Sequence, residues 1–465
     1  MYTGRVRNGC AAVLLLAGIP GPAFSAAKDH LGNPPHVLLI TIDTLRADHL
    51  SCYGYDRNTS PNIDRLASEG VRFDRAYTTI PLTGPAHFSL LTGRYPQEHG
   101  ARNNGVAAAK AAKVLFLPQV LRMHGYRAGA FISAWPLTSR LTHLNRWFDD
   151  YDETLIRRYK LFNSSRYAED VTPLAVRWLE RNARRHFFLW VHYFDPHSPY
   201  EWRDGFAPGG NGARAPAYRA QNAKMRDRIA RYDSEIAYTD AHVGILLETL
   251  DRLALRNSTL VILAADHGES LGEHSYVGHG KHLYQDIVRV PLIFRLPGVA
   301  APGKTIPERV SLLDVAPTVA DLTVGPAKAN LHKPFAGRSL AAALTGDADL
   351  APRSIWYLTF GGEKLFFPRW LSWLWAPKAD LPLRIGREDG NRKLVWSPAE
   401  KSLAIFDTGR DPLEVRPHVV GAENAGYERE TPLLSSWFKS TDVASGESAL
   451  SEHNLEVLRS LGYLQ

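Results

Sequence analysis

The sequence predicts an α/β fold in which a large, mostly parallel sheet lies between helices, followed by a smaller C-terminal subdomain. Continuous apolar runs typical of buried parallel strands occur at residues 36–43, 187–194 and 259–265. An amphipathic pattern at 229–254, with apolar residues at spacings of three, four and seven, predicts a long helix before the third run. Strands and helices that alternate in this way form a sheet covered on both faces. From about residue 350 the alternation fades.

The composition is that of an ordinary globular protein. Its 465 residues are 45% hydrophobic and 22% charged, which is enough chain for one large domain, placed at 34–350, and a smaller one at 351–465. The formal net charge of +7 is spread without a Lys/Arg tract, so it mildly favours an anionic substrate and gives little support for nucleic-acid binding. Four tryptophans lie between Trp356 and Trp375. We expect them to form the core of the smaller subdomain, and the alternative is an exposed surface that binds substrate or lipid.

Residues 1–27 have the pattern of a secretory signal peptide. Arg5 and Arg7 precede an apolar segment at 10–18, and small residues follow it. We expect cleavage within 25–27 and a periplasmic or secreted mature protein without a transmembrane span. The alternative is an N-terminal membrane anchor, which the short apolar segment disfavours because a span needs about 20 residues.

The segment around Thr83 is where the sequence places the chemistry. Gly84-Pro85 predicts a helix start, because proline at the first helical position gives up an N–H that has no partner there, and Gly93 predicts the helix end. The Thr83 hydroxyl then lies where free N–H groups and the positive end of a helix dipole converge, which favours its attack on an anionic phosphate or sulfate group. The alternative is that Thr83 only caps the helix.

Polar side chains stand at the ends of the predicted strands. Asp43 ends the first run, His197 lies in the turn after the second, and Asp266 and His267 follow the third. Because parallel strands end at one edge of a sheet, the fold can bring these groups beside Thr83. Two carboxylates, an imidazole and a threonine oxygen suit a divalent cation, which lowers the pKa of a bound hydroxyl. Each residue alone could instead have a local structural role, such as capping a turn.

Several segments resemble the sulfatase family of the alkaline phosphatase superfamily. Residues 89–96, Ser-Leu-Leu-Thr-Gly-Arg-Tyr-Pro, are similar to the end of the sulfatase signature, and counting back to the family's Cys or Ser nucleophile places it at Thr83. Further similarity lies at 43–54, 60–70 and 195–200, and weaker similarity at 405–414. The resemblance implies an alkaline-phosphatase-like sandwich, a covalent intermediate and a divalent metal ion (calcium, manganese or zinc). The ligands that it implies are Asp43, Thr83, Asp266 and His267.

Residues 278–291 resemble the family segment that carries a substrate-contacting lysine, here Lys281. The resemblance implies that Lys281, His87 and His197 contact the anion, and that Lys281 acts as a point charge. His197 and His279 could hold a second metal ion or protonate the leaving alkoxide, since imidazole does either near neutral pH. Both roles stay open.

The chain departs from the family pattern at several positions. A threonine at position 83 cannot be oxidised to the formylglycine aldehyde of sulfatases. The signature arginine is replaced by His87, the second acid of the first motif by Thr44, and two further cationic positions by Ser133 and Trp135. These differences favour phosphodiesters or phosphonate monoesters at least as much as aryl sulfates.

Three functions are therefore considered. The leading one is an exported, metal-dependent hydrolase of sulfuric or phosphoric esters with a covalent Thr83 intermediate. The second is a transferase that passes a phosphoryl-linked group to a cell-envelope glycan or lipid. The third is a non-catalytic binding protein on a sulfatase fold, which is disfavoured because a dead site has no physical need to keep the separated residues Asp43, Asp266, His267 and Lys281.

Overall fold

The computed structural model describes most of the chain beyond the predicted signal peptide. The described residues are 34–104, 114–159, 162–207, 222–325, 335–346, 348–361 and 382–441.

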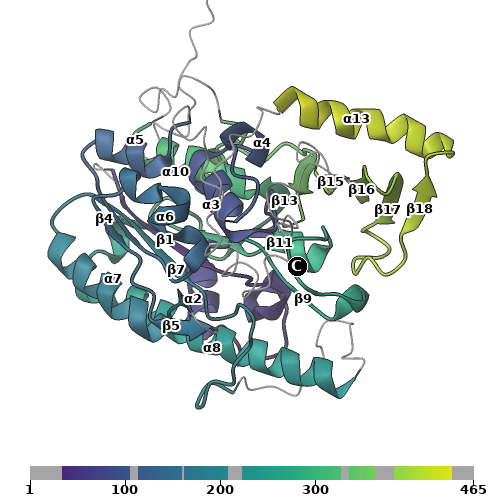
Figure 1. Cartoon of the computed structure of the whole chain (residues 1–465). Helices are drawn as coiled ribbons and strands as arrows, with labels where there is room; N and C mark the ends of the chain where they lie inside the picture. The colour runs from purple at the N-terminus through teal and green to yellow at the C-terminus, as the bar shows by residue number, and fades with distance from the viewer. Residues whose placement is uncertain are drawn as a thin grey trace, which may run out of the picture.

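A nine-stranded sheet forms the centre of the molecule (Figure 1). Its order is β11-β2-β12-β8-β1-β7-β3-β4, and β13 pairs with β2. Strand β1 (His36–Ile42) pairs in parallel with β7 (Phe187–Tyr193) on one side and with β8 (Thr259–Ala265) on the other. These three strands are the three predicted apolar runs, and their carboxyl ends meet at one edge.

The flanking strands make the sheet mixed. Strands β3 and β4 extend its parallel part, whereas β11 and β12 run antiparallel to β2, so the expected large and mostly parallel sheet is confirmed with an antiparallel side. Two short hairpins, β5–β6 and β9–β10, lie outside it. The strand bounds are β2 Val71–Tyr77, β3 Arg127–Phe131, β4 Asp150–Asp152, β5 Arg157–Tyr159, β6 Phe162–Ser165, β9 Ser270–Leu271, β10 Val277–Gly278, β11 Arg289–Val290, β12 Leu292–Arg295 and β13 Lys304–Ser311.

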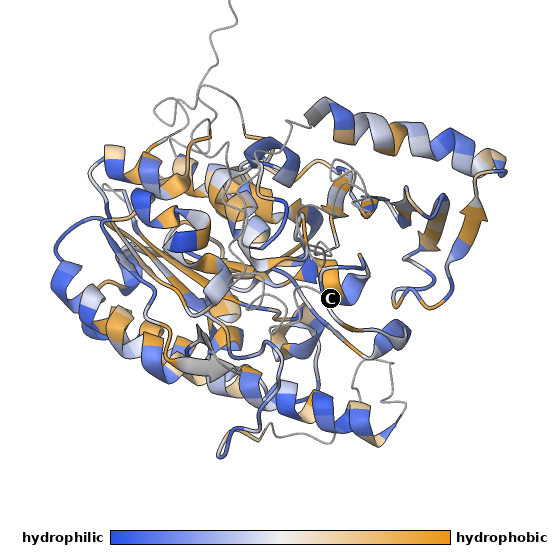
Figure 2. Ribbon diagram, viewed as in Figure 1, coloured by the Kyte–Doolittle hydropathy of each residue, from blue (hydrophilic) through white to orange (hydrophobic). Residues whose placement is uncertain are grey.

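Helices cover both faces of the large sheet (Figure 1). On one face α2 (Pro61–Glu69) and α7 (Ala168–Asn182) pack against α8 (Ala223–Arg252), which begins six residues before the predicted amphipathic pattern. Figure 2 shows apolar strands between helices whose outer faces are hydrophilic. The other helices are α3 Thr83–Thr92, α4 Pro96–His99, α5 Leu117–Met123, α6 Ser139–Thr142, α9 Gln285–Val288, α10 Val315–Thr323 and α11 Ala341–Thr345. Short 3₁₀ turns lie at 47–49, 51–53, 135–137, 144–147, 256–258, 273–275 and 312–314.

A five-stranded antiparallel sheet follows in the C-terminal part. It consists of β14 (Ile355–Thr359), β15 (Arg384–Asp389), β16 (Arg392–Ser397), β17 (Ser402–Asp407) and β18 (His418–Gly421), and α13 (Ala425–Thr441) packs on it. The strands of the two sheets do not interleave along the chain, and we therefore propose 34–350 and 351–465 as domains.

The Trp356 ring belongs to the core between the small sheet and α13. It stacks on Trp437, with ring centroids 4.7 Å apart and an interplanar angle of 13°. The other three tryptophans of the sequence cluster lie outside the described residues. Within the part of the chain that the structure describes, no helix has the length and apolar character needed to cross a membrane.

Helix α3 begins at Thr83, two residues earlier than Gly84-Pro85 predicts, and all its residues are buried. Leu82 precedes the helix in an extended conformation, and Gly93 ends it with a φ of 62°, as expected for a glycine stop. The Thr83 hydroxyl donates a hydrogen bond to Asp43, 3.3 Å away, rather than capping the helix. The interpretation of Thr83 as only a helix cap is therefore wrong.

His99 of α4 connects to α3 through Ser89. Its Nδ1 accepts a hydrogen bond from the Ala101 N–H at 3.1 Å, so Nε2 carries the proton and donates to Ser89 Oγ at 3.0 Å. Burial, with a smaller effect of Arg94, lowers the pKa of His99 from 6.5 to about 3. Above pH 6.5 the His99 imidazole is neutral in both the folded and the unfolded chain, and its contribution to stability is fully present. As the pH falls below 6.5, the unfolded chain binds a proton at His99 that the folded chain does not bind, and this contribution is lost.

The variant His99→Asn tests this linkage. The unfolded protein binds one proton more than the folded protein between pH 6.5 and about 3, so the free energy of unfolding should fall with decreasing pH by up to about 1.4 kcal/mol per pH unit from this group. Denaturant titrations of both proteins at a series of pH values should show a shallower fall in the variant. Equal slopes would assign the acid sensitivity to other groups.

Candidate active site

Thr83 and the strand-end carboxylates come together at the carboxyl edge of the large sheet. Asp43 follows β1 and Asp266 follows β8, and both are fully buried. Asp43 Oδ2 accepts the Thr83 hydrogen bond, and Asp266 Oδ1 accepts the N–H groups of Thr44 at 3.3 Å and His267 at 2.9 Å. Asp43 Oδ1 and Asp266 Oδ2 are buried without a hydrogen-bond partner among the described residues. Each carboxylate therefore has an unsatisfied oxygen.

His267 points a nitrogen lone pair at these oxygens. Its Nδ1 donates to the Gly268 carbonyl at 2.9 Å, which assigns the proton to Nδ1 and leaves Nε2 as the acceptor. Nε2 lies 3.5 Å from Asp266 Oδ2 and 3.9 Å from Asp43 Oδ1. One ligand atom from each of the three residues lies within 4.8 Å of the others. Three buried acceptors around one point fit a bound cation.

The electrostatics of this group also fit a cation. Burial and the neighbouring Asp266 carboxylate raise the pKa of Asp43 well above its usual range, and burial raises the pKa of Asp266. Burial lowers the pKa of His267 to about 3, so the imidazole is neutral at neutral pH and supplies no compensating charge. A divalent cation at this point would stabilise both ionised carboxylates, because its positive charge would compensate for the water that burial removes.

His197 and His279 place two further imidazoles beside this group. Nδ1 of His279 donates to the Pro81 carbonyl at 3.1 Å, and Nδ1 of His197 donates to the Ser198 carbonyl at 2.7 Å. Their Nε2 atoms, 3.3 Å apart, therefore present lone pairs to each other. The His267 and His279 ring centroids are 4.3 Å apart. Facing lone pairs repel unless a proton or a metal ion lies between them, so the pair is a second candidate cation site.

Burial keeps both of these imidazoles neutral at neutral pH. It lowers the pKa of His197 to about 3, with a smaller effect of His279, and that of His279 well below its usual range, with a smaller effect of His267. A neutral pair can accept a proton or coordinate a metal, but it carries no proton of its own to donate from Nε2. The structure therefore brings His197 and His279 together as one unit.

His87 lies in the first turns of α3, and both of its ring nitrogens are hydrogen-bonded. Its Nδ1 donates to the Thr83 carbonyl at 2.7 Å and its Nε2 accepts from the Thr41 hydroxyl at 3.0 Å, which also accepts the Trp190 indole N–H at 2.8 Å. The ring is fully buried and burial lowers its pKa. Both nitrogens are thus engaged within the protein, and the expected contact of His87 with the anion stays a prediction. The ring instead ties the first turn of α3 to β1.

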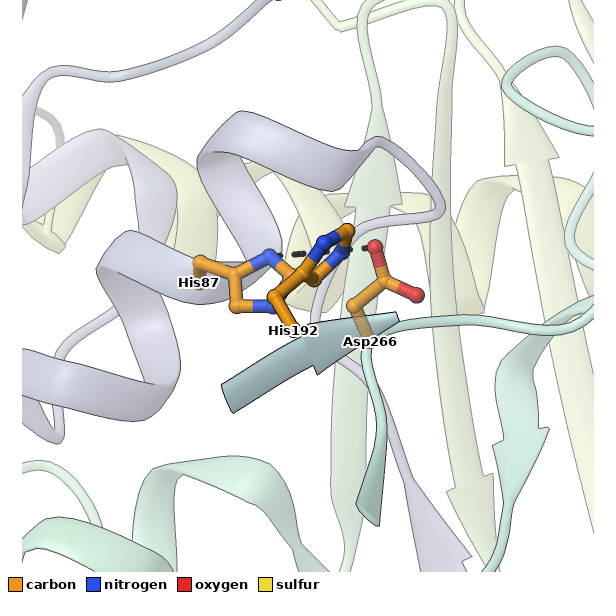
Figure 3. Close-up of side chains that lie close together, drawn as sticks. All are labelled: His87, His192 and Asp266. Atoms are coloured by element: carbon orange, nitrogen blue, oxygen red, sulfur yellow. Dashed lines mark ion pairs between the residues drawn. The ribbon is translucent and has the colours of Figure 1, made fainter. Parts of the chain in front are cut away.

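His192 is a site residue that the sequence did not single out. It is the sixth residue of β7, and its only signal is an imidazole inside an otherwise apolar or aromatic strand. The Ser133 N–H donates to Nδ1 at 3.4 Å, and Nε2 lies 3.6 Å from Asp43 Oδ2, the oxygen that also accepts from Thr83. Figure 3 shows His87, His192 and Asp266 converging. Their potential ligand atoms lie within 4.8 Å of one another, but both His87 nitrogens are already hydrogen-bonded.

Asn104 is a second residue that the sequence analysis missed. Its Oδ1 accepts the Gly84 N–H at 2.8 Å, and its Nδ2 is buried without a partner in the described part of the chain. It comes just before a glycine at 105, which is an ordinary turn pattern and gives no sign of chemistry. The structure places this donor beside the first turn of α3.

Lys281 lies in the loop that follows β10, two residues after His279. The residue is half-buried, and its backbone carbonyl accepts a hydrogen bond from Arg384 Nη1 at 2.6 Å. Its role as an anion contact stays a prediction.

The fold and this group of residues define a hydrolase of the alkaline phosphatase superfamily. Residues 35–326 match the family model described as Sulfatase, and the chain belongs to the sulfatase family. The family expected from the motifs is thus confirmed. The prediction that the chain is a sulfatase-like hydrolase, and not a binding protein, is confirmed as well.

Known proteins similar to this chain include several sulfatases. An N-acetylglucosamine-6-O-sulfatase from Bacteroides thetaiotaomicron is 24% identical over 402 residues, covering 67% of this chain and 70% of that protein. A choline-sulfatase from Rhizobium meliloti is 24% identical over 441 residues, covering 82% and 81%. The structure of a phosphonate monoester hydrolase from Silicibacter pomeroyi has a TM-score of 0.69 at 21% identity, covering 87% and 95%. This last likeness confirms the predicted fold.

Proposed function

We propose that this sulfatase-family enzyme cleaves sulfuric or phosphoric esters through a covalent intermediate on Thr83. Asp43, Thr83, Asp266 and His267 are the proposed ligands of a divalent metal ion. The observation that carries the proposal is the Thr83 hydroxyl bonded to Asp43 at 3.3 Å, beside buried oxygens and a lone pair that lack partners among the described residues. When bound, the metal lowers the pKa of the hydroxyl and neutralises a non-bridging ester oxygen.

The chain's own residues orient the reaction. Asp43 Oδ2 accepts the hydrogen bond of the hydroxyl and so directs Thr83 Oγ1. As Oγ1 attacks the phosphorus or sulfur atom, the hydroxyl proton passes towards this carboxylate and the ester oxygen leaves as an alkoxide. The positive end of the α3 dipole and the Lys281 ammonium favour the anionic group in this position. The buried amide of Asn104 offers one further donor.

The facing Nε2 atoms of His197 and His279 complete the proposed site. Their facing lone pairs can hold a second metal ion, or the pair can take up a proton at Nε2 and pass it to the leaving oxygen. Both alternatives use the same two atoms, and metal content distinguishes them.

We expect activity on phosphodiesters or phosphonate monoesters at least comparable to that on aryl sulfates. Both nitrogens of His87 are engaged within the protein, so the position of the family arginine supplies no charge to a sulfate group. The metal group and Lys281 then provide most of the electrostatic stabilisation, and this suits singly charged phosphoryl esters equally well.

The assay compares kcat/KM for an aryl sulfate, a phosphodiester and a phosphonate monoester on one metal-loaded preparation, with Thr83→Ala as the background. Turnover of the sulfate more than tenfold faster than of both phosphoryl esters would contradict the expected preference.

We also infer that the enzyme is exported to the periplasm or secreted. The support is the pattern of residues 1–27, which lie outside the described residues.

A further inference from the structure

The turn that carries His279 and Lys281 is held by the C-terminal sheet. The buried Thr359 hydroxyl, at the end of β14, donates to the Gly280 carbonyl. Arg384 Nη1, at the start of β15, donates to the Lys281 carbonyl at 2.6 Å. Thr359 and Arg384 lie directly opposite each other in the β14–β15 register, so one cross-strand pair binds two consecutive carbonyls.

The same strand also holds the segment that leads to the nucleophile. The Leu358 N–H donates to the Thr79 carbonyl at 2.9 Å. Ile80 and Leu82 pack in the apolar core of the small sheet together with Leu358 and Ile385. Neighbouring residues of β14 thus bind both the segment before Thr83 and the loop with the two predicted catalytic side chains.

The loop conformation exposes its carbonyls to this strand. Gly278 has a φ of 109° and Gly280 a φ of 88°, a backbone region that glycine favours. A Cβ atom at position 280 would lie 3.2 Å from Leu82 Cδ2, so the loop packs closely on the nucleophile segment. On the other side of the turn, His279 bonds to the Pro81 carbonyl. The loop therefore lies between the nucleophile segment and the small sheet.

We propose that Thr359 and Arg384 are positioning residues, which set the place of His279 and Lys281 relative to Thr83. This inference rests on the proposed function of the site. Removing the Thr359 hydroxyl leaves the Gly280 carbonyl without this partner and frees the turn from β14. Displacements of about 1 Å in a catalytic group can lower a rate by about 10²-fold, so Thr359 and Arg384 act on the reaction through the backbone of this loop.

The test compares three variants. Thr359→Val removes the hydroxyl at nearly unchanged volume, and Thr359→Ser keeps it. Thr249→Val is the matched control, because Thr249 is a buried threonine of α8 whose hydroxyl also donates to a backbone carbonyl. We expect kcat to fall about tenfold or more in Thr359→Val at unchanged metal content, and to stay within about twofold in the other two variants. Parent-level kcat in Thr359→Val would overturn the proposal.

Hydrogen exchange supplies a readout that does not depend on activity. Peptides covering 279–288 should exchange faster in Thr359→Val than in the parent and in Thr249→Val, and Thr359→Ser should restore the protection. Unchanged exchange of this segment would show that the hydroxyl does not hold the turn. Thr83→Ala, assayed in parallel, separates the proposed function from the positioning role of Thr359 and Arg384. Parent-level activity of Thr83→Ala would reject the proposed function. The exchange result would still decide whether β14 holds the loop.

Discussion

Replacing Thr83 with alanine should lower kcat/KM on every cleaved ester by at least about 10³-fold. The reason is chemical, because the variant has no oxygen at the position from which the covalent intermediate forms. The hydroxyl is fully buried and donates to Asp43, and its loss removes the nucleophile while leaving the helix backbone in place. Initial rates with sulfate, phosphodiester and phosphonate substrates measure the effect.

Two variants control this experiment. Thr83→Ser keeps the hydroxyl and should retain part of the activity. Thr92→Ala removes a buried hydroxyl from the same helix, where it donates to the Phe88 carbonyl, and should leave kcat/KM nearly unchanged. Turnover by Thr83→Ala at the parent rate would show that another group forms the intermediate, and the proposed mechanism would have to be abandoned.

The central fold follows from the sequence because buried parallel strands are continuous apolar runs. The strands β1, β7 and β8 are apolar over nearly their whole length, and each is followed by polar residues. The antiparallel side is less predictable, since β11 and β12 are short and depend on their pairing with β2, more than 200 residues earlier. The local preference of proline predicts that α3 starts at Pro85, two residues after its observed start at Thr83.

Parts of the candidate site depend on contacts that no local pattern encodes. His87 has the position of a family cation, but the partner of its Nε2 is Thr41 on β1, which is 46 residues earlier in the sequence. His192 is one polar residue inside an apolar strand, and only the packing of β7 beside β1 shows that it faces Asp43. Thr359 and Arg384 reach the carbonyls of Gly280 and Lys281 across about 80 and 100 residues of sequence. Motifs identify side chains that carry chemistry, whereas the residues that orient them appear only in the folded chain.

Chelation of the bound metal should abolish activity, and a divalent ion should restore it. Thr83 at its unperturbed pKa is a poor nucleophile, and without a cation the buried Asp43 and Asp266 carboxylates repel each other and have raised pKa values. His267 favours manganese or zinc, and calcium fits the carboxylate oxygens. Full activity in protein shown to be metal-free by elemental analysis would refute the metal mechanism.

Substitution of the ligands makes the same test without a chelator. Asp266→Asn should lose at least one bound metal ion per chain and most of the activity, because it removes a ligand charge at nearly unchanged volume. Asp240→Asn is the matched control, since Asp240 is equally buried on α8 but accepts hydrogen bonds from the start of α2. Its metal content should equal that of the parent, and an equal loss in both variants would point to general destabilisation.

The stoichiometry then decides the role of the histidine pair. If the facing Nε2 atoms of His197 and His279 hold a second metal ion, the parent binds two ions per chain and His197→Ala binds one. If they share a proton that is passed to the leaving oxygen, both proteins bind one ion, and His197→Ala loses activity most strongly with substrates whose leaving alkoxide is most basic. Unchanged metal content together with unchanged activity on every leaving group would remove the pair from the mechanism.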